Sequence, residues 1–402
     1  MSGASGTDVS NGGFSQWRGS PVTIAGTWDD TDAASQTALP SLTGEYAGWP
    51  HAVDVAVGGT VLGSDESYAQ AAHGDYTDRW TQMAKHLQHA RANSTGPTFV
   101  RPWHEFNGDW YKNWQVTPDN VADYKTSFRL MVGIIRQYCP GCLIVWGANN
   151  STSAGSSTIA DAYPGDDVVD VIGDDSYNAN GAPVVTDDTS WQHYSSQVDG
   201  AGNPVGPAAW LAFAASHGKP LGFPEWGLNA GGGGGDNPYY IQAMHDFFTT
   251  RAAGPSDTNL AGKVIYDVYF DVPQAPGFTI GQGDNPTASA QYRSLPWGDQ
   301  ATARNGPAGT PAPTSTAATA DGLGGVLLGT TPETAPAPST PPADQSATTT
   351  ASQPSSDATD APPIAAATAS AAATTAPRTR PPAPLTPADT PVTPASAPAG
   401  LP

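Results

Sequence analysis

Residues 98–111 have the sequence TFVRPWHEFNGDWY, and the character of the chain changes abruptly at the middle of this stretch. The first three residues are apolar or β-branched and favour a buried strand. They are followed by Arg101, His104, Glu105 and Asn107, which are interleaved with aromatic residues. We therefore predict a strand that presents chemically active side chains at its carboxyl end.

A second stretch, PLGFPEWG at residues 220–227, is also an apolar run that ends in a carboxylate beside a Trp. Its Glu225 is informative because this chain makes little use of glutamate: five of its 37 acidic residues are Glu. Cleavage of a glycosidic bond requires two carboxyl groups that flank the bond. Glu105 and Glu225 are therefore our candidate catalytic pair.

The pattern of apolar runs predicts a (β/α)8 TIM barrel. Short strand-like runs alternate with segments of helical periodicity, which indicates a parallel sheet covered by helices. A doubly wound open sheet is the alternative, but no Gly-x-Gly-x-x-Gly turn opens a helix after an early strand. The strand-like runs are at residues 22–26, 53–57, 98–101, 143–146, 168–173, 220–223 and 264–270.

These runs give seven strands, one fewer than a closed barrel needs. We expect the first strand to be missing or incomplete and to belong just upstream of residues 2–6, as it would if the N-terminus were clipped. Residues 1–298 form the predicted catalytic domain. Residues 299–402 consist mostly of Pro, Thr, Ala, Ser and Gly, a composition that cannot bury enough apolar area to fold, and we predict a disordered tail.

Composition excludes several classes of partner. The net charge of −21 and only 16 basic residues disfavour nucleic acids and anionic membranes, which are bound by clustered Lys and Arg. No apolar run approaches the ~18 residues that span a bilayer. We expect a monomer with no cofactor or metal.

Cys139 and Cys142 are the two cysteines. They close a predicted helix, whereas a redox Cys-x-x-Cys opens one, so we expect a structural disulfide or a thiol pair in a turn.

Asp174 and Asp175 lack the regular ligand spacing of a Ca²⁺ site, so we expect them to cap a helix or to form hydrogen bonds in a loop.

The two glutamates should meet at the mouth of the barrel. They are 120 residues apart, which corresponds to three βα units of roughly 40 residues and places them after strands four and seven. Two carboxylates facing each other there could approach to ~5 Å, the separation of a retaining glycosidase. Trp103 and Trp110 could desolvate Glu105 and make it an acid, whereas Tyr177 and Arg101 could keep Glu225 ionised.

Aromatic side chains near the carboxylates are candidate platforms for sugar rings. Trp28, which ends an early strand beside two Asp residues, is a candidate sugar contact, and those Asp residues could equally cap a helix. Three other Trp residues, Trp103, Trp146 and Trp210, are predicted to belong to the core. The remaining candidate platforms are Trp110, Tyr111, Trp114 and Trp226.

The motif RPWHEFNGDWY at residues 101–111, together with PEWG at residues 224–227, resembles glycoside hydrolase family 26 of clan A. That family contains endo-β-mannanases and some β-glucanases and β-xylanases, and the resemblance covers residues 10–297. It implies Glu105 as acid/base and Glu225 as nucleophile. It also implies that His104 is a polar neighbour in the −1 region, Trp110 a sugar-contacting ring and Tyr177 a partner of the nucleophile.

Two departures from this pattern bear on the substrate. Residues 268–272 are VYFDV where the mannanases of the family usually place a Trp, and residues 57–59 are VGG where a polar or His-bearing sequence is expected. We therefore expect a secreted retaining endo-β-glycanase acting on β-1,4-mannan by double displacement, with β-glucan and β-xylan as alternatives. A non-hydrolytic carbohydrate-binding barrel is another hypothesis, and a third gives the tail the working role of a cell-wall spacer.

Overall fold

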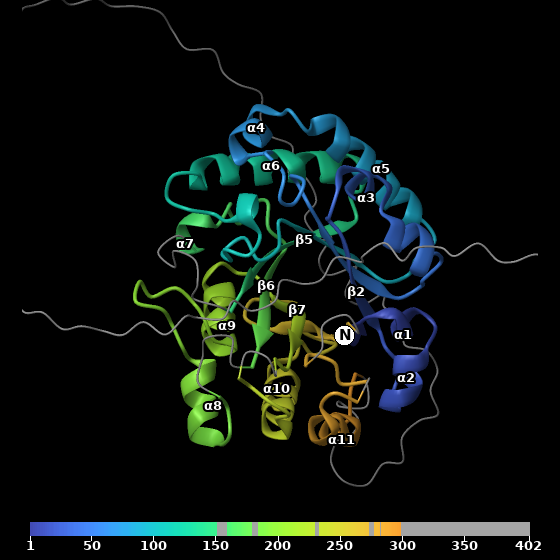
Figure 1. Ribbon diagram of the computed structural model, residues 1–402, viewed down its shortest axis with the longest axis vertical. Coiled ribbons are helices and arrows are strands. Elements are labelled where there is room, and N and C mark those ends of the chain that lie inside the picture. The colour runs from blue at the N-terminus through green and yellow to red at the C-terminus, as the bar shows by residue number, and fades with distance from the viewer. Residues whose placement is uncertain (151–158, 179–183, 230–232, 273–276, 282, 299–402) are drawn as a thin grey trace, which may run out of the picture. The chain divides into compact units, whose positions relative to one another are not determined.

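The computed structural model describes residues 1–150, 159–178, 184–229, 233–272, 277–281 and 283–298 (Figure 1). The predicted tail at residues 299–402 lies outside these residues, so its predicted disorder stays a prediction. Within the described part, the strands occupy the centre and the helices surround them (Figure 1).

Eight parallel strands form a closed barrel in which each strand pairs with its neighbours in sequence and the last pairs with the first. The (β/α)8 prediction is confirmed. Almost every strand residue is buried, because the interior and the helical layer cover both faces of the sheet. The strands are β1 (Ser2–Ser5), β2 (Ile24–Asp29), β3 (Ala52–Val57), β4 (Thr98–Pro102), β5 (Cys142–Asn149), β6 (Val171–Tyr177), β7 (Leu221–Gly227) and β8 (Val264–Phe270).

The expectation of a missing first strand was wrong. Strand β1 lies within residues 2–6 and pairs with both β2 and β8. Its sequence, SGAS, carries no β-branched or large apolar residue, so the usual strand signal is absent. The small residues are needed because the backbones approach closely: a Cβ on Gly3 would lie 1.7 Å from the carbonyl oxygen of Ile24.

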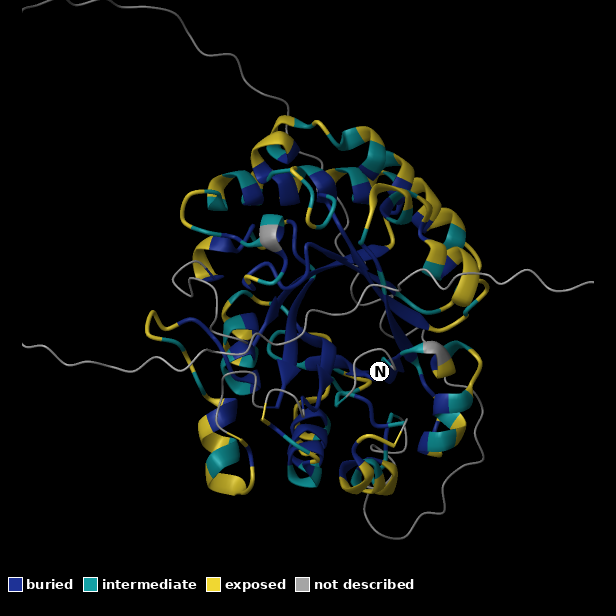
Figure 2. Cartoon of the chain, in the orientation of Figure 1, coloured by how far each residue is buried: buried dark blue, intermediate teal, exposed yellow. Residues whose placement is uncertain are grey.

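The helices turn buried faces toward the barrel and exposed faces outward (Figure 2). The longest, α5 and α6, have the apolar periodicity expected from the sequence. No described helix is long and apolar enough to cross a membrane. The described helices are α1 (Thr7–Ser10), α2 (Gly13–Arg18), α3 (Ala33–Ala38), α4 (Tyr68–His73), α5 (Thr77–Arg91), α6 (Val121–Tyr138), α7 (Ile159–Ala162), α8 (Asp188–Ser195), α9 (Pro207–Ser216), α10 (Pro238–Arg251) and α11 (Pro286–Ser294), with short turns η1 (Ser41–Glu45) and η2 (Lys112–Trp114).

Large aromatic residues fill the layer between barrel and helices. Trp103, Trp146 and Trp210 are fully buried there, as predicted. Cys139 and Cys142 form a disulfide at the turn between α6 and β5, one of the two arrangements expected from the sequence.

Candidate active site

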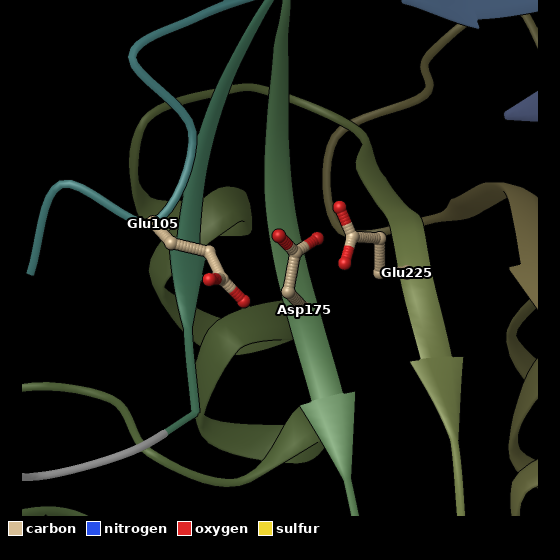
Figure 3. A group of neighbouring side chains, drawn as sticks. All are labelled: Glu105, Asp175 and Glu225. Atoms are coloured by element: carbon tan, nitrogen blue, oxygen red, sulfur yellow. The ribbon is translucent and has the colours of Figure 1, made fainter. Parts of the chain in front are cut away.

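Glu105 and Glu225 meet at the carboxyl end of the barrel. Glu105 follows β4 by three residues and Glu225 lies in β7, the two strands predicted from the sequence. Asp175 of β6 is in register with Glu225. One carboxylate oxygen from each of the three residues lies within 4.8 Å of the others, and the side chains converge in Figure 3. The fold therefore brings together two glutamates that are 120 residues apart in the sequence.

The turn that carries Glu105 has unusual backbone geometry. Trp103 and Glu105 have φ angles of 47° and 53°, in the left-handed region that L residues other than Asn, Asp and His seldom adopt. The N–H of Glu105 donates to the carbonyl of Gly147 in β5 at 3.1 Å, and the carbonyl of Glu105 accepts from the N–H of Gly108 at 2.9 Å. Strain of this kind persists where the surrounding structure holds it, often at functional sites.

Three donors surround the carboxylate of Glu225. Oε1 accepts from Nη1 of Arg101 and from Nε1 of Trp28, both at 2.9 Å. Oε2 accepts from the hydroxyl of Tyr177, also at 2.9 Å. Donors directed at both oxygens fix the orientation of the carboxylate. The structure thus brings Arg101, Trp28 and Tyr177, all predicted site residues, into contact with Glu225.

Arg101 is the central positive charge of the site, and its side chain is fully buried. Its Nε donates to Asp54 at 2.5 Å and its Nη1 lies 3.4 Å from Asp175. Asp54 also accepts from the hydroxyl of Tyr266 at 2.6 Å. Burial raises the pKa of Asp54, and it raises the pKa of Asp175 well above the ordinary value, although Arg101 opposes both shifts.

Glu105 has a different environment from Glu225. It accepts from Nδ2 of Asn149 at 2.5 Å and from Nε1 of Trp110 at 2.8 Å. Burial, reinforced by the negative charge of Glu225, nevertheless raises the pKa of Glu105 to about 8. At neutral pH Glu105 therefore holds a proton.

His104 lies in the wall beside Glu105. Its ring packs on Tyr111 and Trp114, and its Nε2 lies 3.5 Å from Oδ2 of Asp30. Burial and the charge of Arg101 lower the pKa of His104 well below its ordinary value, so the imidazole is neutral. Burial, with the charge of Glu225, raises the pKa of Asp30 to about 7 against the opposing effect of Arg101.

Asn107 supports the site from behind. Its Nδ2 donates to the carbonyl of Asn149 at 2.7 Å, and its Oδ1 accepts from the N–H of the same residue at 2.9 Å. These two bonds hold the end of β5 that presents Asn149 to Glu105. Tyr111 is 7 % exposed and packs against His104 and Trp114.

Trp226, predicted as a sugar contact, does not reach the site. It is fully buried, its Nε1 lies 3.3 Å from Asp267, and its ring packs on Phe248 and Tyr292 of the helical layer. Because side chains alternate along a strand, a neighbour of the inward-facing Glu225 must point outward. The position of Trp226 therefore corrects that prediction.

The sequence also carries the signature of a known family over its first half. Residues 2–194 match the family model described as glycosyl hydrolase family 26. The match places residues 2–194 in glycosyl hydrolase family 26. The matched range includes Glu105 and ends before Glu225.

A mannan endo-1,4-beta-mannosidase from Bifidobacterium adolescentis is 30% identical to this chain over 97 residues. The alignment covers 24% of this chain and 9% of the relative, so the chain spans a small part of that protein's length.

Two solved structures share the fold. A double mutant of the Cellulomonas fimi endo-beta-1,4-mannanase is 17% identical with a TM-score of 0.51, covering 75% of this chain and 72% of that one. The catalytic domain of the Bacillus sp. JAMB-750 GH26 endo-beta-1,4-mannanase is 14% identical with a TM-score of 0.52. The match covers 82% of this chain and 89% of that one.

Three side chains of this site were not predicted from the sequence. Asp175 was expected in a cap or loop, but it lies inside the barrel in contact with Arg101. Its two-residue spacing from Tyr177 was the available signal, since residues i and i+2 of a strand share a face. Asn149 and Phe270 also end strands; the Phe270 ring lies 5.5 Å from Trp28.

The carboxylates could suggest a metal site as well. Among the residues that the structure describes, Glu105, Asp175 and Glu225 are the one group of His, Cys, Asp or Glu side chains close enough to share an ion. Nη1 of Arg101 already lies within 3.4 Å of two of them. A guanidinium in that place supplies the positive charge that a metal would bring, so the arrangement fits a pair of glycosidase carboxyls.

Proposed function

We propose that this protein is a glycoside hydrolase, a retaining endo-β-1,4-mannanase with Glu105 as acid/base and Glu225 as nucleophile. The observation that carries the proposal is the approach of the two glutamates, which have carboxylate oxygens within 4.8 Å of each other. Retaining enzymes hold their carboxyl groups about 5–5.5 Å apart, whereas inverting enzymes leave about 6.5–9.5 Å for a water molecule. The separation favours direct attack by one carboxylate.

In the first step, Glu225 attacks the anomeric carbon while Glu105 donates its proton to the departing glycosidic oxygen. The carbon–oxygen bond of the substrate breaks as the ester bond to Glu225 forms. The donors from Arg101, Trp28 and Tyr177 orient the carboxylate of Glu225 for attack. The raised pKa of Glu105 keeps the required proton in place at neutral pH.

In the second step, water attacks the anomeric carbon, Glu105 takes its proton, and the ester to Glu225 breaks. The charge of Glu225 is one cause of the raised pKa of Glu105. Because esterification removes that charge, the pKa of Glu105 falls in the covalent intermediate. The same residue therefore changes from an acid into a base without any movement of the chain.

Mannan is the proposed polymer because the relative and the two structures of like fold are named as mannanases or a mannosidase. β-Glucan and β-xylan remain alternatives, since β8 ends in Phe270 where a Trp is usual in the mannanases that the sequence resembles. The different environments of Glu105 and Glu225 favour catalysis over a binding-only barrel, which would gain nothing from one buried, protonated glutamate beside a second held by three donors.

The test is release of reducing sugar from mannan, glucomannan, mixed-linkage glucan, cellulose and xylan. We expect cleavage of mannan, and loss of turnover but not of polymer binding in Glu105→Ala and Glu225→Ala. Glu45→Ala, at an exposed glutamate, is the matched control. Proton NMR of the first product should show a β-anomer; an α-anomer would rule out double displacement.

We also propose that the enzyme is secreted. A polysaccharide cannot enter the cell that uses it, and disulfides such as Cys139–Cys142 persist mainly in oxidising compartments. Fractionation of the producing cells checks this: activity confined to the cytoplasmic fraction would contradict it.

A further inference from the structure

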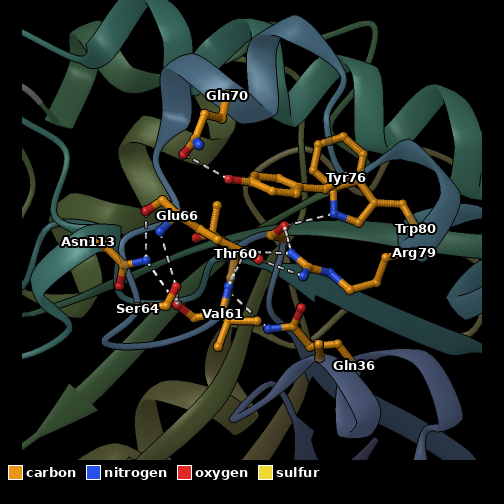
Figure 4. Close-up of polar contacts among 12 residues, drawn as sticks. Gln36, Thr60, Val61, Ser64, Glu66, Gln70, Tyr76, Arg79, Trp80 and Asn113 are labelled. Atoms are coloured by element: carbon orange, nitrogen blue, oxygen red, sulfur yellow. Dashed lines mark hydrogen bonds and ion pairs between the residues drawn. The ribbon is translucent and has the colours of Figure 1, made fainter.

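One side-chain amide on the loop that carries Glu105 forms three hydrogen bonds to a neighbouring loop. We call residues 103–116, between β4 and α6, the acid loop, and residues 58–67, between β3 and α4, the support loop. Oδ1 of Asn113 accepts from the N–H of Gly63 at 2.9 Å, and its Nδ2 donates to the carbonyls of Val61 and Glu66, both at 3.0 Å (Figure 4). Each of these three hydrogen bonds joins the amide to a backbone atom of the support loop.

Two indoles add to this attachment. Trp103 donates to Oγ1 of Thr60, and Trp114 donates to the backbone carbonyl of Thr60, both at 3.1 Å. The packing at this point leaves no space, since a Cβ on Gly59 would lie 1.9 Å from the ring of Trp103. The acid loop is therefore bound to the support loop near both of its ends.

The support loop is itself fixed to α5. Glu66 accepts two hydrogen bonds from Arg79, at 2.8 and 2.7 Å, and one from the N–H of Val61 at 2.7 Å. Arg79 and Trp80 also donate to the carbonyl of Gly59, at 3.1 and 2.8 Å (Figure 4). The paired side chains of Glu66 and Arg79 are 23% and 14% exposed, so water screens this bidentate pair only partly.

We propose that Asn113 and Glu66 are positioning residues for Glu105, acting through the two loops without touching the substrate. Glu105 is held in a left-handed conformation, which relaxes unless the rest of the loop is fixed. Trp110, which donates to Glu105, is three residues from Asn113 on the same loop. Freeing the loop moves the acid, and a shift of ~1 Å can cost ~10²-fold in rate.

The nucleophile is positioned independently of these loops. Its three donors come from β2, β4 and β6. Loss of the loop attachment should therefore weaken proton donation and leave attack by Glu225 nearly intact. This selectivity separates positioning of the acid from general damage to the fold, and the inference rests on the proposed role of Glu105.

The experiment compares two substrates in Asn113→Ala and Glu66→Gln. With mannan, whose leaving group needs a proton, kcat/KM should fall by about tenfold or more, because general acid catalysis contributes ~10²–10⁴-fold. With 2,4-dinitrophenyl β-mannobioside, whose leaving group departs unprotonated, kcat/KM should stay within about twofold of wild type on the same reasoning. Equal losses on both substrates, or no loss on either, would overturn the proposal.

Two control variants should keep the wild-type ratio. Asn259→Ala removes an exposed amide between α10 and β8 that accepts a hydrogen bond from the N–H of Ala261. Asp167→Asn weakens an exposed bidentate pair with Arg129. If wild type cleaves another of the five polymers, the aryl glycoside of that sugar replaces the mannobioside. If it cleaves none, the proposed function fails; failure of the loop inference alone shows as an unchanged substrate ratio in active variants.

Discussion

Nη1 of Arg101 lies 2.9 Å from Oε1 of Glu225, and the same guanidinium also contacts Asp54 and Asp175. One buried planar cation thus serves three carboxylates from three other strands. A guanidinium can do this because its five N–H groups point outward in a fixed fork. The nucleophile is therefore oriented by the geometry of the cation as well as by its charge.

We expect Arg101→Lys to lose activity although it keeps the positive charge. An ammonium cannot reach all three carboxylates, so kcat/KM should fall by about 10²–10³-fold, the usual effect of losing one well-placed donor. The midpoint of urea unfolding should also fall, because buried carboxylates left unpaired cost about 3–5 kcal/mol. Arg129→Lys, at an exposed ion pair, is the control. Near-wild-type activity of Arg101→Lys would show that the planar geometry of the guanidinium is not needed.

The pH profile should report the proton on Glu105. Burial, with the charge of Glu225, raises the pKa of Glu105 to about 8. A general acid is active while protonated, so kcat/KM for mannan should hold up to that pH and fall above it. The basic limb should be absent with 2,4-dinitrophenyl β-mannobioside, which needs no proton. If kcat/KM falls at the same basic pH with both substrates, the titrating group is not Glu105.

Trp110→Phe should move that basic limb upward. The indole N–H of Trp110 donates to Oε2 of Glu105 and lowers the pKa of Glu105 against the larger effect of burial. Removing this donor destabilises the carboxylate, so the pKa rises and the limb shifts to higher pH, by less than about one unit for a neutral donor. Trp191→Phe, on α8, should leave the profile unchanged. A downward shift would show that the ring acts mainly by excluding water.

Much of this site could be predicted because the residues at strand ends carry the signal. Glu105 and Glu225 each follow an apolar run, and the regular length of the βα units placed them on strands four and seven. Asp175 was missed because its neighbour Asp174 makes the pair look like a polar loop, although both lie within β6 and are fully buried. Only the direction of each side chain separates the site residue from its neighbour.

Other features depend on contacts that sequence alone does not provide. Strand β1 consists of small residues, and its pairing with β2 and β8 makes it a strand. Trp226 directly follows Glu225, but because side chains alternate along a strand, its ring points into the core. The amide of Asn113 is bonded to residues about 50 positions away, and nothing in the local sequence marks it.

Gly108→Ala should damage the acid without greatly destabilising the fold. A Cβ at this position would lie 2.3 Å from the ring of Trp110, the indole that bonds to Glu105. The ring must move, so we expect a loss of at least about tenfold in kcat/KM for mannan, in line with the ~10²-fold effect of small misplacements. Gly133→Ala in α6, where a Cβ would meet nothing within 4 Å, should stay fully active. Full activity of both variants would remove the indole from the mechanism.

Asp30→Asn should become progressively more stable than wild type as pH rises. Burial, with the charge of Glu225, raises the pKa of Asp30 from its ordinary value of 3.8 to about 7, despite Arg101. Between these two pH values the unfolded chain releases the proton that the folded chain retains, so wild type loses up to about 1.4 kcal/mol of stability per pH unit. Below that window neither state is charged, and above it the loss is constant.

Urea unfolding of Asp30→Asn and wild type from pH 4 to 8 measures this difference directly. The gap in unfolding free energy should widen up to about pH 7 and then stay level. Asp167→Asn should behave in the opposite way, because the hydrogen bonds from Arg129 lower the pKa of Asp167, so its contribution is present at neutral pH and disappears in acid. Parallel curves for Asp30→Asn and wild type would mean that Asp30 is ionised in the folded protein and that Arg101 compensates for its burial.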